Sequence, residues 1–242
     1  MLHRKLLIAD FESDSPKPEV CQPVQLAALM IDMYTLEVVE DSKFCSMMKP
    51  DIKDWGKIKP EIVDWESYTK DKDIVDTAKW HAKNYKVGVD EIFKMWEEAP
   101  EQRHVWDQFR SYVTKYNVKK SIWGAPVCGG MNIRDFDLTI VDRLNTKYGL
   151  DNIFWRRDVY DIQDFVGHWL PYRKDCPNNF KMDTLREYFG LTTDNAHDAL
   201  KDVEDEAEII IRFMKLHQSL CNKIAFTPKD KAKLKAKEEA NV

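Results

Sequence analysis

Residues 6–13 carry the sequence LLIADFES, and the fold of the chain is decided there. The apolar run at its start has strand length and little polar character, which predicts a strand buried on both faces. Asp10 and Glu12 end the run, and side chains two residues apart on a strand point to the same face. Two such carboxylates repel each other and are costly to desolvate. We therefore expect them to share a divalent cation held by oxygen ligands.

The pattern Asp-x-Glu is weak by itself, because it occurs three times, at residues 10–12, 64–66 and 202–204. No buried strand leads into the second copy, and the third copy lies in an acidic, helix-like run. Only the first copy has a strand before it. A lone copy is more often a solvated strand end than a metal site.

The composition is that of a globular protein. The 242 residues suffice for one α/β core, and 43% of them are hydrophobic and 33% charged. No apolar run approaches the length of a membrane span, and the first residues leave no room for a signal peptide. The five cysteines are scattered and form no Cys-x-x-Cys pair, so neither a disulfide framework nor a zinc ribbon is indicated, and a reducing cytoplasm fits best.

The net charge of −5 argues against a binder that holds nucleic acid through a basic patch. It does not argue against an enzyme that holds nucleic acid through bound metal ions, because those ions bring their own positive charge.

The hydrophobic pattern predicts strands at residues 6–13, 24–32 and 37–48, and their short connections indicate an antiparallel meander. Two further strands are expected at 119–125 and 153–155, with Gly129 and Gly130 breaking the chain between them. Predicted helices cover residues 72–84, 90–97, 101–116, 160–170 and 182–189, a segment from about Asp137 to Gly149, and a long segment behind residues 193–198. A lysine-rich tail follows residue 224, which we expect to be a solvated helix or disordered.

Aromatic and histidine side chains give no site of their own. Five tryptophans lie between residues 55 and 106, namely Trp55, Trp65, Trp80, Trp96 and Trp106. Packing is a commoner use of such residues than a base-stacking surface. His3, His81, His104, His168 and His217 show no ligand spacing and are expected to be structural or on the surface.

Further acids and one histidine fall at the ends of predicted elements. Asp137 begins a helix after the glycine-broken loop, and Asp202 lies in the first turns of the last long helix. His197 precedes Asp202 by five residues, which turn about 500° in a helix, so His197 is expected on the entry loop. Each residue alone would more often be solvated or capping, and only their conjunction indicates a site.

This order of motifs resembles the DEDDh family of 3′→5′ exonucleases, which includes polymerase-proofreading, RNase T-type and oligoribonuclease enzymes. The three motifs are IADFE at 8–12, NIRDFDL at 132–138 and AHDALKD at 196–202. Similarity at residues 25–28 (QLAA) and 181–185 (KMDTL) extends the resemblance over about residues 5–216. The long second motif and the tryptophan-rich insert are similar to phage-encoded members.

The chain departs from the family at two motifs. Phe11 and Ser13 stand where the family has threonine. In the second motif Phe and Asp follow Asn132 by four and five residues, where the family has three and four, and an extra acid, Asp135, lies nearby. Asp135 and Asp137 are therefore alternative ligands, and the Phe-Asp-apolar order favours Asp137.

The resemblance implies an RNase H-like three-layer α/β/α fold with a mixed, mostly five-stranded sheet. It implies one exonuclease domain at 1–222 and a lysine-rich tail at 223–242. The implied activity is metal-dependent 3′→5′ hydrolysis of single-stranded nucleic acid, DNA favoured, to 5′-mononucleotides.

The resemblance also implies roles for individual residues. Two Mg²⁺ or Mn²⁺ ions would be held by four carboxylates, those of Asp10, Glu12, Asp137 and Asp202. His197 would take the proton from the attacking water, a role that its ordinary pKa of about 6.5 suits. The residues expected to contact the 3′ end of the substrate are Phe11, Asn132 and Phe136.

Two alternatives stay open from the sequence. One is an RNA-trimming or oligoribonuclease activity, since discrimination of the 2′-OH depends on pocket shape. The other is an inactive nuclease-fold adaptor in a replication or repair complex, against which the intact acids and His197 argue. The expected partners are the 3′ end of a single strand and a polymerase or repair complex.

Overall fold

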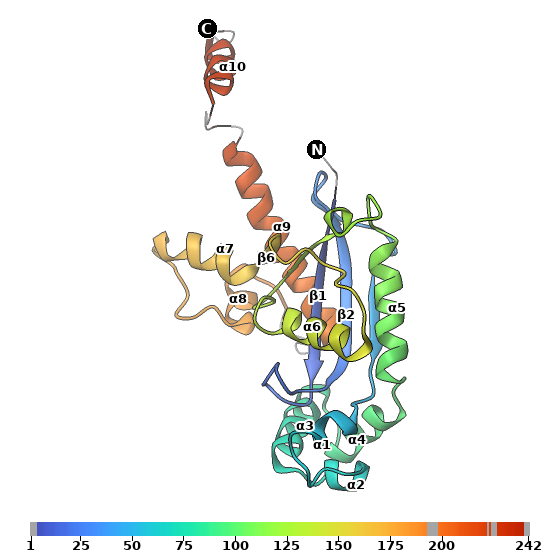
Figure 1. Ribbon diagram of the computed structural model, residues 1–242. Coiled ribbons are helices and arrows are strands. Elements are labelled where there is room, and N and C mark those ends of the chain that lie inside the picture. Colours follow the sequence, from blue (N-terminus) through green and yellow to red (C-terminus); the bar gives the residue numbers. More distant parts are fainter. Residues whose placement is uncertain (1–3, 193–197, 222, 224–226, 240–242) are drawn as a thin grey trace.

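The computed structural model describes residues 4–192, 198–221, 223 and 227–239 of the chain. Within these residues a six-stranded mixed sheet forms the centre of the molecule (Figure 1). Its strands are β1 (Lys5–Ser13), β2 (Pro23–Asp32), β3 (Glu37–Val38), β4 (Phe44–Met47), β5 (Val127–Gly130) and β6 (Val159–Asp161). The order across the sheet is β3-β2-β1-β5-β6, and β4 also pairs with β2.

Strand β1 is central and has two different neighbours. It is antiparallel to β2 along its whole length and parallel to β5, but the pairing with β5 stops at Ile8. Asp10 and Glu12 therefore lie beyond the end of the parallel pair. Ligands of open α/β sheets bind at this edge, where parallel strands end.

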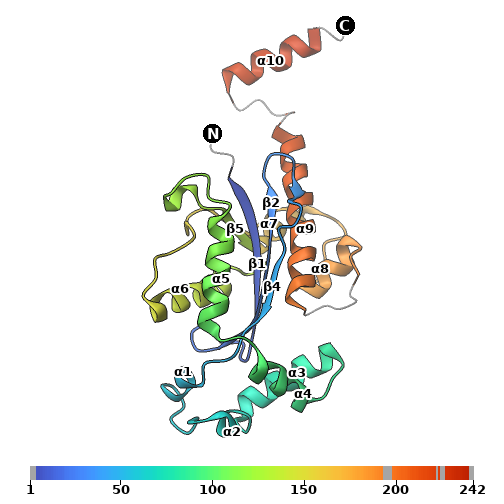
Figure 2. The same cartoon turned by 90° about the vertical axis from the view of Figure 1, so that its right-hand side faces the viewer.

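Helices cover both faces of the sheet, and the alternation along β1 shows which residues meet them. Leu7, Ala9 and Phe11 share a core with α5 (Gln102–Thr114) and α6 (Asp137–Tyr148). Leu6 and Ile8 share the opposite core with α7 (Ile162–Trp169), α8 (Met182–Phe189) and α9 (Ala199–Cys221). Figure 2 shows α5 and α6 on one side of the sheet and α8 and α9 on the other. The predicted α/β/α layers are confirmed.

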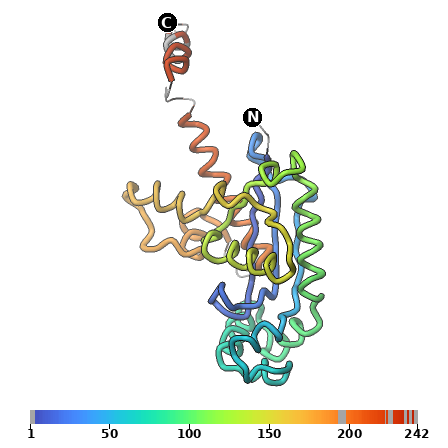
Figure 3. The backbone as a smooth tube through the Cα atoms, in the orientation of Figure 1, coloured from blue at the N-terminus to red at the C-terminus, as the bar shows by residue number. Residues whose placement is uncertain are grey.

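A helical insert, residues 52–98, lies between β4 and α5 beyond the ends of β1 and β2 (Figure 3). It contains α1 (Ile52–Gly56), α2 (Trp65–Tyr68), α3 (Lys72–Tyr85) and α4 (Val89–Glu98). The insert has a hydrophobic core of its own, which reaches the sheet at Val24. The carboxylate of Asp14, just after β1, accepts hydrogen bonds from Trp55 Nε1 at 2.6 Å and the Tyr68 hydroxyl at 2.8 Å. These bonds fix the insert to the end of β1.

The strand predicted at 119–125 is wrong. A 3-10 turn occupies Ile122–Gly124, and the strand is β5, which contains the two glycines expected to break the chain. A Cβ on Gly129 would lie 3.1 Å from side-chain carbons of Leu6 and Ile8, and one on Gly130 would lie 3.0 Å from the Ala9 carbonyl oxygen. Here glycine permits close approach of the backbone inside a sheet.

Two other strand predictions need correction. Residues 153–155 form no strand, and β6 follows at Val159–Asp161. The single strand expected at 37–48 is divided into β3 and β4, because the chain turns between them at Asp41, with φ +54°. This division gives the sheet six strands in place of the expected five.

The predicted helices are confirmed to within a few residues. The lysine-rich tail contains α10 (Pro228–Glu239), which stands apart from the body in Figures 1 and 2 and fits a solvated helix. The division into a domain at 1–222 and a tail at 223–242 stays a prediction. Among the described residues, no helix combines the length and the apolar character needed to cross a membrane.

Candidate active site

Three carboxylates from two elements meet at the edge of the sheet. Asp10 and Glu12 share the face of β1 that bears Leu6 and Ile8, which α9 covers. Asp202 comes from the first turn of α9. Oxygen atoms of these three carboxylates all lie within 4.8 Å of one another.

Asp137 joins this group from the other layer. It is the first residue of α6, it is buried, and its Oδ1 accepts a hydrogen bond of 2.9 Å from the backbone nitrogen of Phe11. That bond fixes the second motif to the strand between Asp10 and Glu12. The alternative ligand, Asp135, is exposed.

Glu206 is a fifth carboxylate that the sequence motifs did not identify. It lies one helical turn beyond Asp202, is 2% exposed, and its Oε2 has no hydrogen-bond partner among the described residues. The same oxygen would lie 3.2 Å from a Cβ on Gly130. The i, i+4 spacing from Asp202 was the available signal, but the surrounding acidic run suggested a solvated face.

The acids raise one another's proton affinity. Burial, followed by repulsion from Asp202 and Asp137, raises the pKa of Glu12 to about 8. Burial also raises the pKa of Asp137 to about 8, against the lowering effect of the Phe11 hydrogen bond. The pKa values of Asp10 and Glu206 lie well above their ordinary values, again chiefly through desolvation and then through Asp137.

Arg186 compensates part of this charge. Its fully buried guanidinium on α8 lies 2.5 Å from Asp202 Oδ1 through Nη2 and 2.8 Å from Asp205 Oδ2 through Nε. Asp202 is therefore held in one orientation by a neighbouring helix. Arg186 directly follows the segment 181–185 that supports the resemblance, but its role was not predicted.

His81 of α3 also reaches the site, although the sequence gave it no role beyond structure or surface. The ring is buried, and Nε2 lies 2.9 Å from the carbonyl oxygen of Ser13. A carbonyl only accepts, so Nε2 carries the hydrogen in this contact. Nδ1 lies 3.9 Å from Glu12 Oε2, which places the insert directly beside the acids.

His197, the predicted base, lies outside the described residues. The described neighbour Asp198 precedes α9, and its side chain accepts a hydrogen bond from Leu200 N at 3.0 Å. Asn132 adopts a left-handed conformation with φ +53°, and its backbone nitrogen donates to Asp161 Oδ1. Its backbone therefore shapes the loop of the second motif.

A cavity of about 610 Å³ opens over Asp10 and Glu12. This volume lies within the usual range of ligand pockets. Phe11 and Phe136 line it, but Phe11 is only 4% exposed and its ring packs 6.5 Å from that of Trp106. Most of the Phe11 ring thus belongs to the core, and Phe136 is the more accessible of the two.

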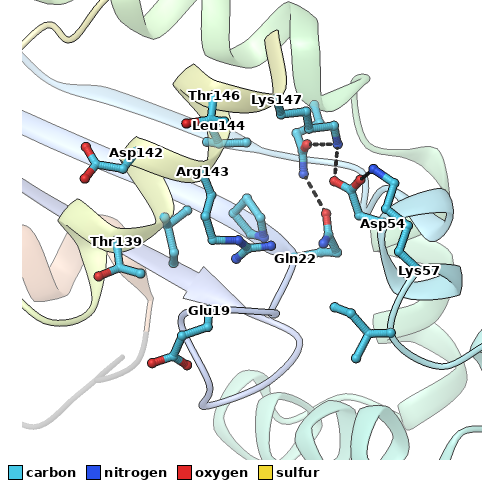
Figure 4. Close-up of a pocket in the computed structure, with 14 residues that line it drawn as sticks. Glu19, Gln22, Asp54, Lys57, Thr139, Asp142, Arg143, Leu144, Thr146 and Lys147 are labelled. Atoms are coloured by element: carbon cyan, nitrogen blue, oxygen red, sulfur yellow. Dashed lines mark hydrogen bonds and ion pairs between the residues drawn. The ribbon is translucent and has the colours of Figure 1, made fainter. Parts of the chain in front are cut away.

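A second cavity, of about 520 Å³, lies between α6 and the insert (Figure 4). Lys147 bridges to Asp51 and Asp54 at 2.7 Å, and Arg143 donates to the backbone carbonyls of Pro18 and Cys21. Because both cations already have partners within the protein, we interpret this cavity as part of the contact between the insert and α6.

Solved structures share this architecture. E. coli exonuclease I in complex with a dT13 oligonucleotide has a TM-score of 0.61 and 16% identity, over 91% of this chain and 43% of that chain. The zinc-bound form of the E. coli exonuclease I complex with single-stranded DNA has a TM-score of 0.60 and 17% identity, and the match covers 90% of this chain and 41% of that chain. A moderately thermophilic exonuclease I from Methylocaldum szegediense has a TM-score of 0.57 and 16% identity, and the match covers 86% of this chain and 40% of that chain.

The chain spans less than half the length of these solved structures. No protein-family model and no curated protein sequence matches it. At such low identity the likeness concerns the arrangement of strands and helices. The chain has the RNase H-like α/β/α fold of exonuclease I, as the three motifs predicted.

Proposed function

We propose that the chain is a metal-dependent 3′→5′ exonuclease that releases 5′-mononucleotides from single-stranded DNA. The observation that carries the proposal is the convergence of four carboxylates, from Asp10, Glu12, Asp137 and Asp202, at the end of β1. Two of them, Asp10 and Glu12, line the cavity. The fold adds support, because the exonuclease I structures that share it include complexes with dT13 and dA16 oligonucleotides.

The donor set fits hard divalent cations. The oxygens of Asp10, Glu12 and Asp202 are within reach of one ion, and Glu206 Oε2 is buried without a hydrogen-bond partner in the described part of the chain. Mg²⁺ and Mn²⁺ prefer such oxygen ligands. Two ions, when bound, would polarise the scissile phosphate and acidify a water molecule.

The chain's own residues would orient this chemistry. Arg186 holds one oxygen of Asp202, and the Phe11 backbone nitrogen holds one oxygen of Asp137. Two ligands on different helices thus keep fixed positions relative to β1. We propose that His197, two residues before the first residue of α9 in the sequence, accepts the proton of the attacking water.

The substrate end would enter the 610 Å³ cavity, with Phe136 on its wall. A net charge of −5 suits short or single-stranded substrates better than long duplex, which is held through many phosphate contacts. RNA stays an alternative substrate, and a polymerase or repair partner stays a prediction.

The test uses 3′- and 5′-labelled single-stranded DNA and RNA, with Mg²⁺, Mn²⁺ or EDTA. Asp10→Asn and Asp137→Asn should abolish 3′→5′ shortening, and His197→Ala should slow it about 10²- to 10⁴-fold. The matched control is Asp135→Asn, because the exposed Asp135 should leave the rate within a factor of two.

Shortening that survives EDTA or Asp10→Asn would exclude the metal mechanism. A folded protein that degrades neither DNA nor RNA would support the adaptor alternative.

A further inference from the structure

Helix α3 of the insert presents two different stripes. Its buried residues, Ile74, Ala78, His81 and Ala82, pack into the core of the insert. A second stripe lines the cavity over the acids and consists of Asp73, Asp76, Thr77 and Trp80. The spacing i, i+3, i+4, i+7 places these four on one face of the helix.

Trp80 differs from the other tryptophans of this region. Its side chain is 43% exposed, whereas Trp55, Trp96 and Trp106 are at most 2% exposed. The expectation that this group serves packing therefore describes the buried members fully, whereas Trp80 also lines the cavity with part of its surface exposed. A partly exposed aromatic ring on a cavity wall can contact a planar ligand.

The position of Trp80 is fixed relative to the acids. Its ring packs edge to face against His81, with centroids 4.9 Å apart and planes at 79°. His81 in turn contacts the Ser13 carbonyl and faces Glu12. A ligand on Trp80 would thus lie beside the end of β1, where the scissile bond is proposed to lie.

The charges on the walls of the cavity distinguish bases from phosphates. Among the described α3 residues that line it, Asp73 and Asp76 are acidic and none is lysine or arginine. His81 also lines it, and its Nε2 hydrogen is directed at the Ser13 carbonyl. Lys17 is exposed on the loop after β1 and also lines the cavity. Asp73 and Asp76 also engage Lys59 and Lys79 in ion pairs, so this wall favours the uncharged face of a base over a phosphate.

We infer that Trp80 stacks on a nucleobase of the strand whose 3′ end lies at the carboxylates, an inference that rests on the proposed function. Stacking on an indole is tolerant of sequence, because every base has a π face. The site would therefore hold any of the four bases and would fix the distance between the held base and the reacting phosphate.

The experiment measures binding of fluorescent single-stranded DNA by anisotropy, in the Asp10→Asn background so that the strand is not consumed. Trp80→Ala should weaken binding about 5- to 150-fold, the range of base–aromatic stacking, and Trp80→Phe should restore most of it. Trp123→Ala is the matched control, since Trp123 is 52% exposed and packs on Trp155 outside the cavity. Thermal unfolding checks that each variant is folded.

A set of oligonucleotides with one abasic site at successive positions from the 3′ end completes the test. At one position, the abasic site should weaken binding to the protein that keeps Trp80 but should not weaken binding to Trp80→Ala. The effects of removing the base and removing the ring would then be non-additive in a double-mutant cycle. Equal losses at every position, or wild-type affinity of Trp80→Ala, would overturn the inference.

Because this readout is binding, it is separate from the test of hydrolysis. Normal cleavage with an additive cycle would reject only the stacking site. Absence of cleavage with a non-additive cycle would reject the nuclease proposal and keep a single-strand binding site.

Discussion

Three parts of the chain meet at the carboxylate of Glu12. Its own strand supplies Asp10, α9 supplies Asp202, and the insert supplies His81 at 3.9 Å. Repulsion between the acids raises the free energy of the folded, metal-free protein. The carboxylates stay close because the packing of two layers holds them there. Such strain from buried charge is common where a cation or substrate is to be bound.

Glu206 gives a prediction at the residue scale. In the folded, metal-free protein its pKa is raised by burial and then by Asp137 and Asp202. A carboxyl with a raised folded pKa loses its favourable contribution as pH rises through that pKa. Glu206→Gln removes this cost and keeps the side-chain volume, so we expect the metal-free protein to gain about 1 kcal/mol or more at pH 8.

Denaturant unfolding in EDTA at pH 6 and pH 8 measures this gain. Glu208→Gln is the control, because Glu208 lies on the same helix but pairs with Arg212 at 46% side-chain exposure. Equal stability changes for both variants at pH 8 would contradict the prediction that repulsion between ionised Glu206 and the other acids destabilises the folded protein.

The order and context of the motifs predicted that Asp10, Glu12 and Asp202 lie together, because they end or begin strong elements. They did not identify Glu206. Other residues of the site have no local signal. His81 meets Ser13 across 68 positions, and Arg186 meets Asp202 from a different helix. Pairings of this kind depend on how elements pack, which periodicity does not encode.

At the scale of elements, one buried carboxylate makes several of the contacts that join the insert to the sheet. Asp14 is fully buried and accepts from Gln22 N, Trp55 Nε1 and the Tyr68 hydroxyl. Since the α3 wall of the cavity belongs to this insert, its attachment determines where His81 and Trp80 stand. Stability and substrate binding should therefore change together when the joint is broken.

Asp14→Ala is the corresponding prediction. It leaves three buried donors without an acceptor, and we expect a loss of about 3 kcal/mol in the free energy of unfolding. Protease cleavage within 52–98 should accelerate, and the KM for single-stranded DNA should rise. Asp76→Ala, at an exposed residue of the same insert, should change stability by less than about 0.5 kcal/mol.

Loss of stability in Asp14→Ala without faster cleavage of the insert would contradict the proposed joint. Asp14→Asn is a second test. Its amide oxygen can still accept, but its NH₂ group faces another donor, so the variant should regain only part of the stability lost in Asp14→Ala.

The helices could be predicted from sequence because each has an apolar stripe and clear ends, such as Gly149 and Gly190 in left-handed conformation. The short strands β5 and β6 could not. Each has three or four residues, and β5 contains two glycines whose use depends on Leu6, Ile8 and Ala9 across the sheet. A strand of that length is specified by its neighbours more than by its own pattern.

At the scale of the molecule, the fold brings both parallel strand ends and three helices to one edge of the sheet. The metal-free protein carries there a cluster of carboxyls whose pKa values are raised, to about 8 for Glu12 and Asp137. In the unfolded chain these groups titrate near pH 4. The stability they contribute is therefore present below about pH 4 and is lost as pH rises to about 8.

This sign gives the last prediction. In EDTA the melting temperature should fall as pH rises from 5 to 8, and Asp14, whose burial raises its pKa to about 6, adds to the fall in the lower half of that range. The carboxyl of Asp32, whose pKa hydrogen bonds lower to about 2, is fully ionised there and adds no slope. Mg²⁺ at about 100 times its Kd should add about 2.7 kcal/mol, or roughly 5–11 °C.

The gain from Mg²⁺ should be larger at pH 8 than at pH 5, and binding at pH 7 should release protons, because ligands must be ionised to bind the cation. Calorimetry in two buffers of different ionisation enthalpy measures that release. Asp10→Asn should lose the Mg²⁺ gain, and Asp135→Asn should keep it. A melting temperature in EDTA that rises with pH, or a gain from Mg²⁺ that Asp10→Asn retains, would place the cation elsewhere.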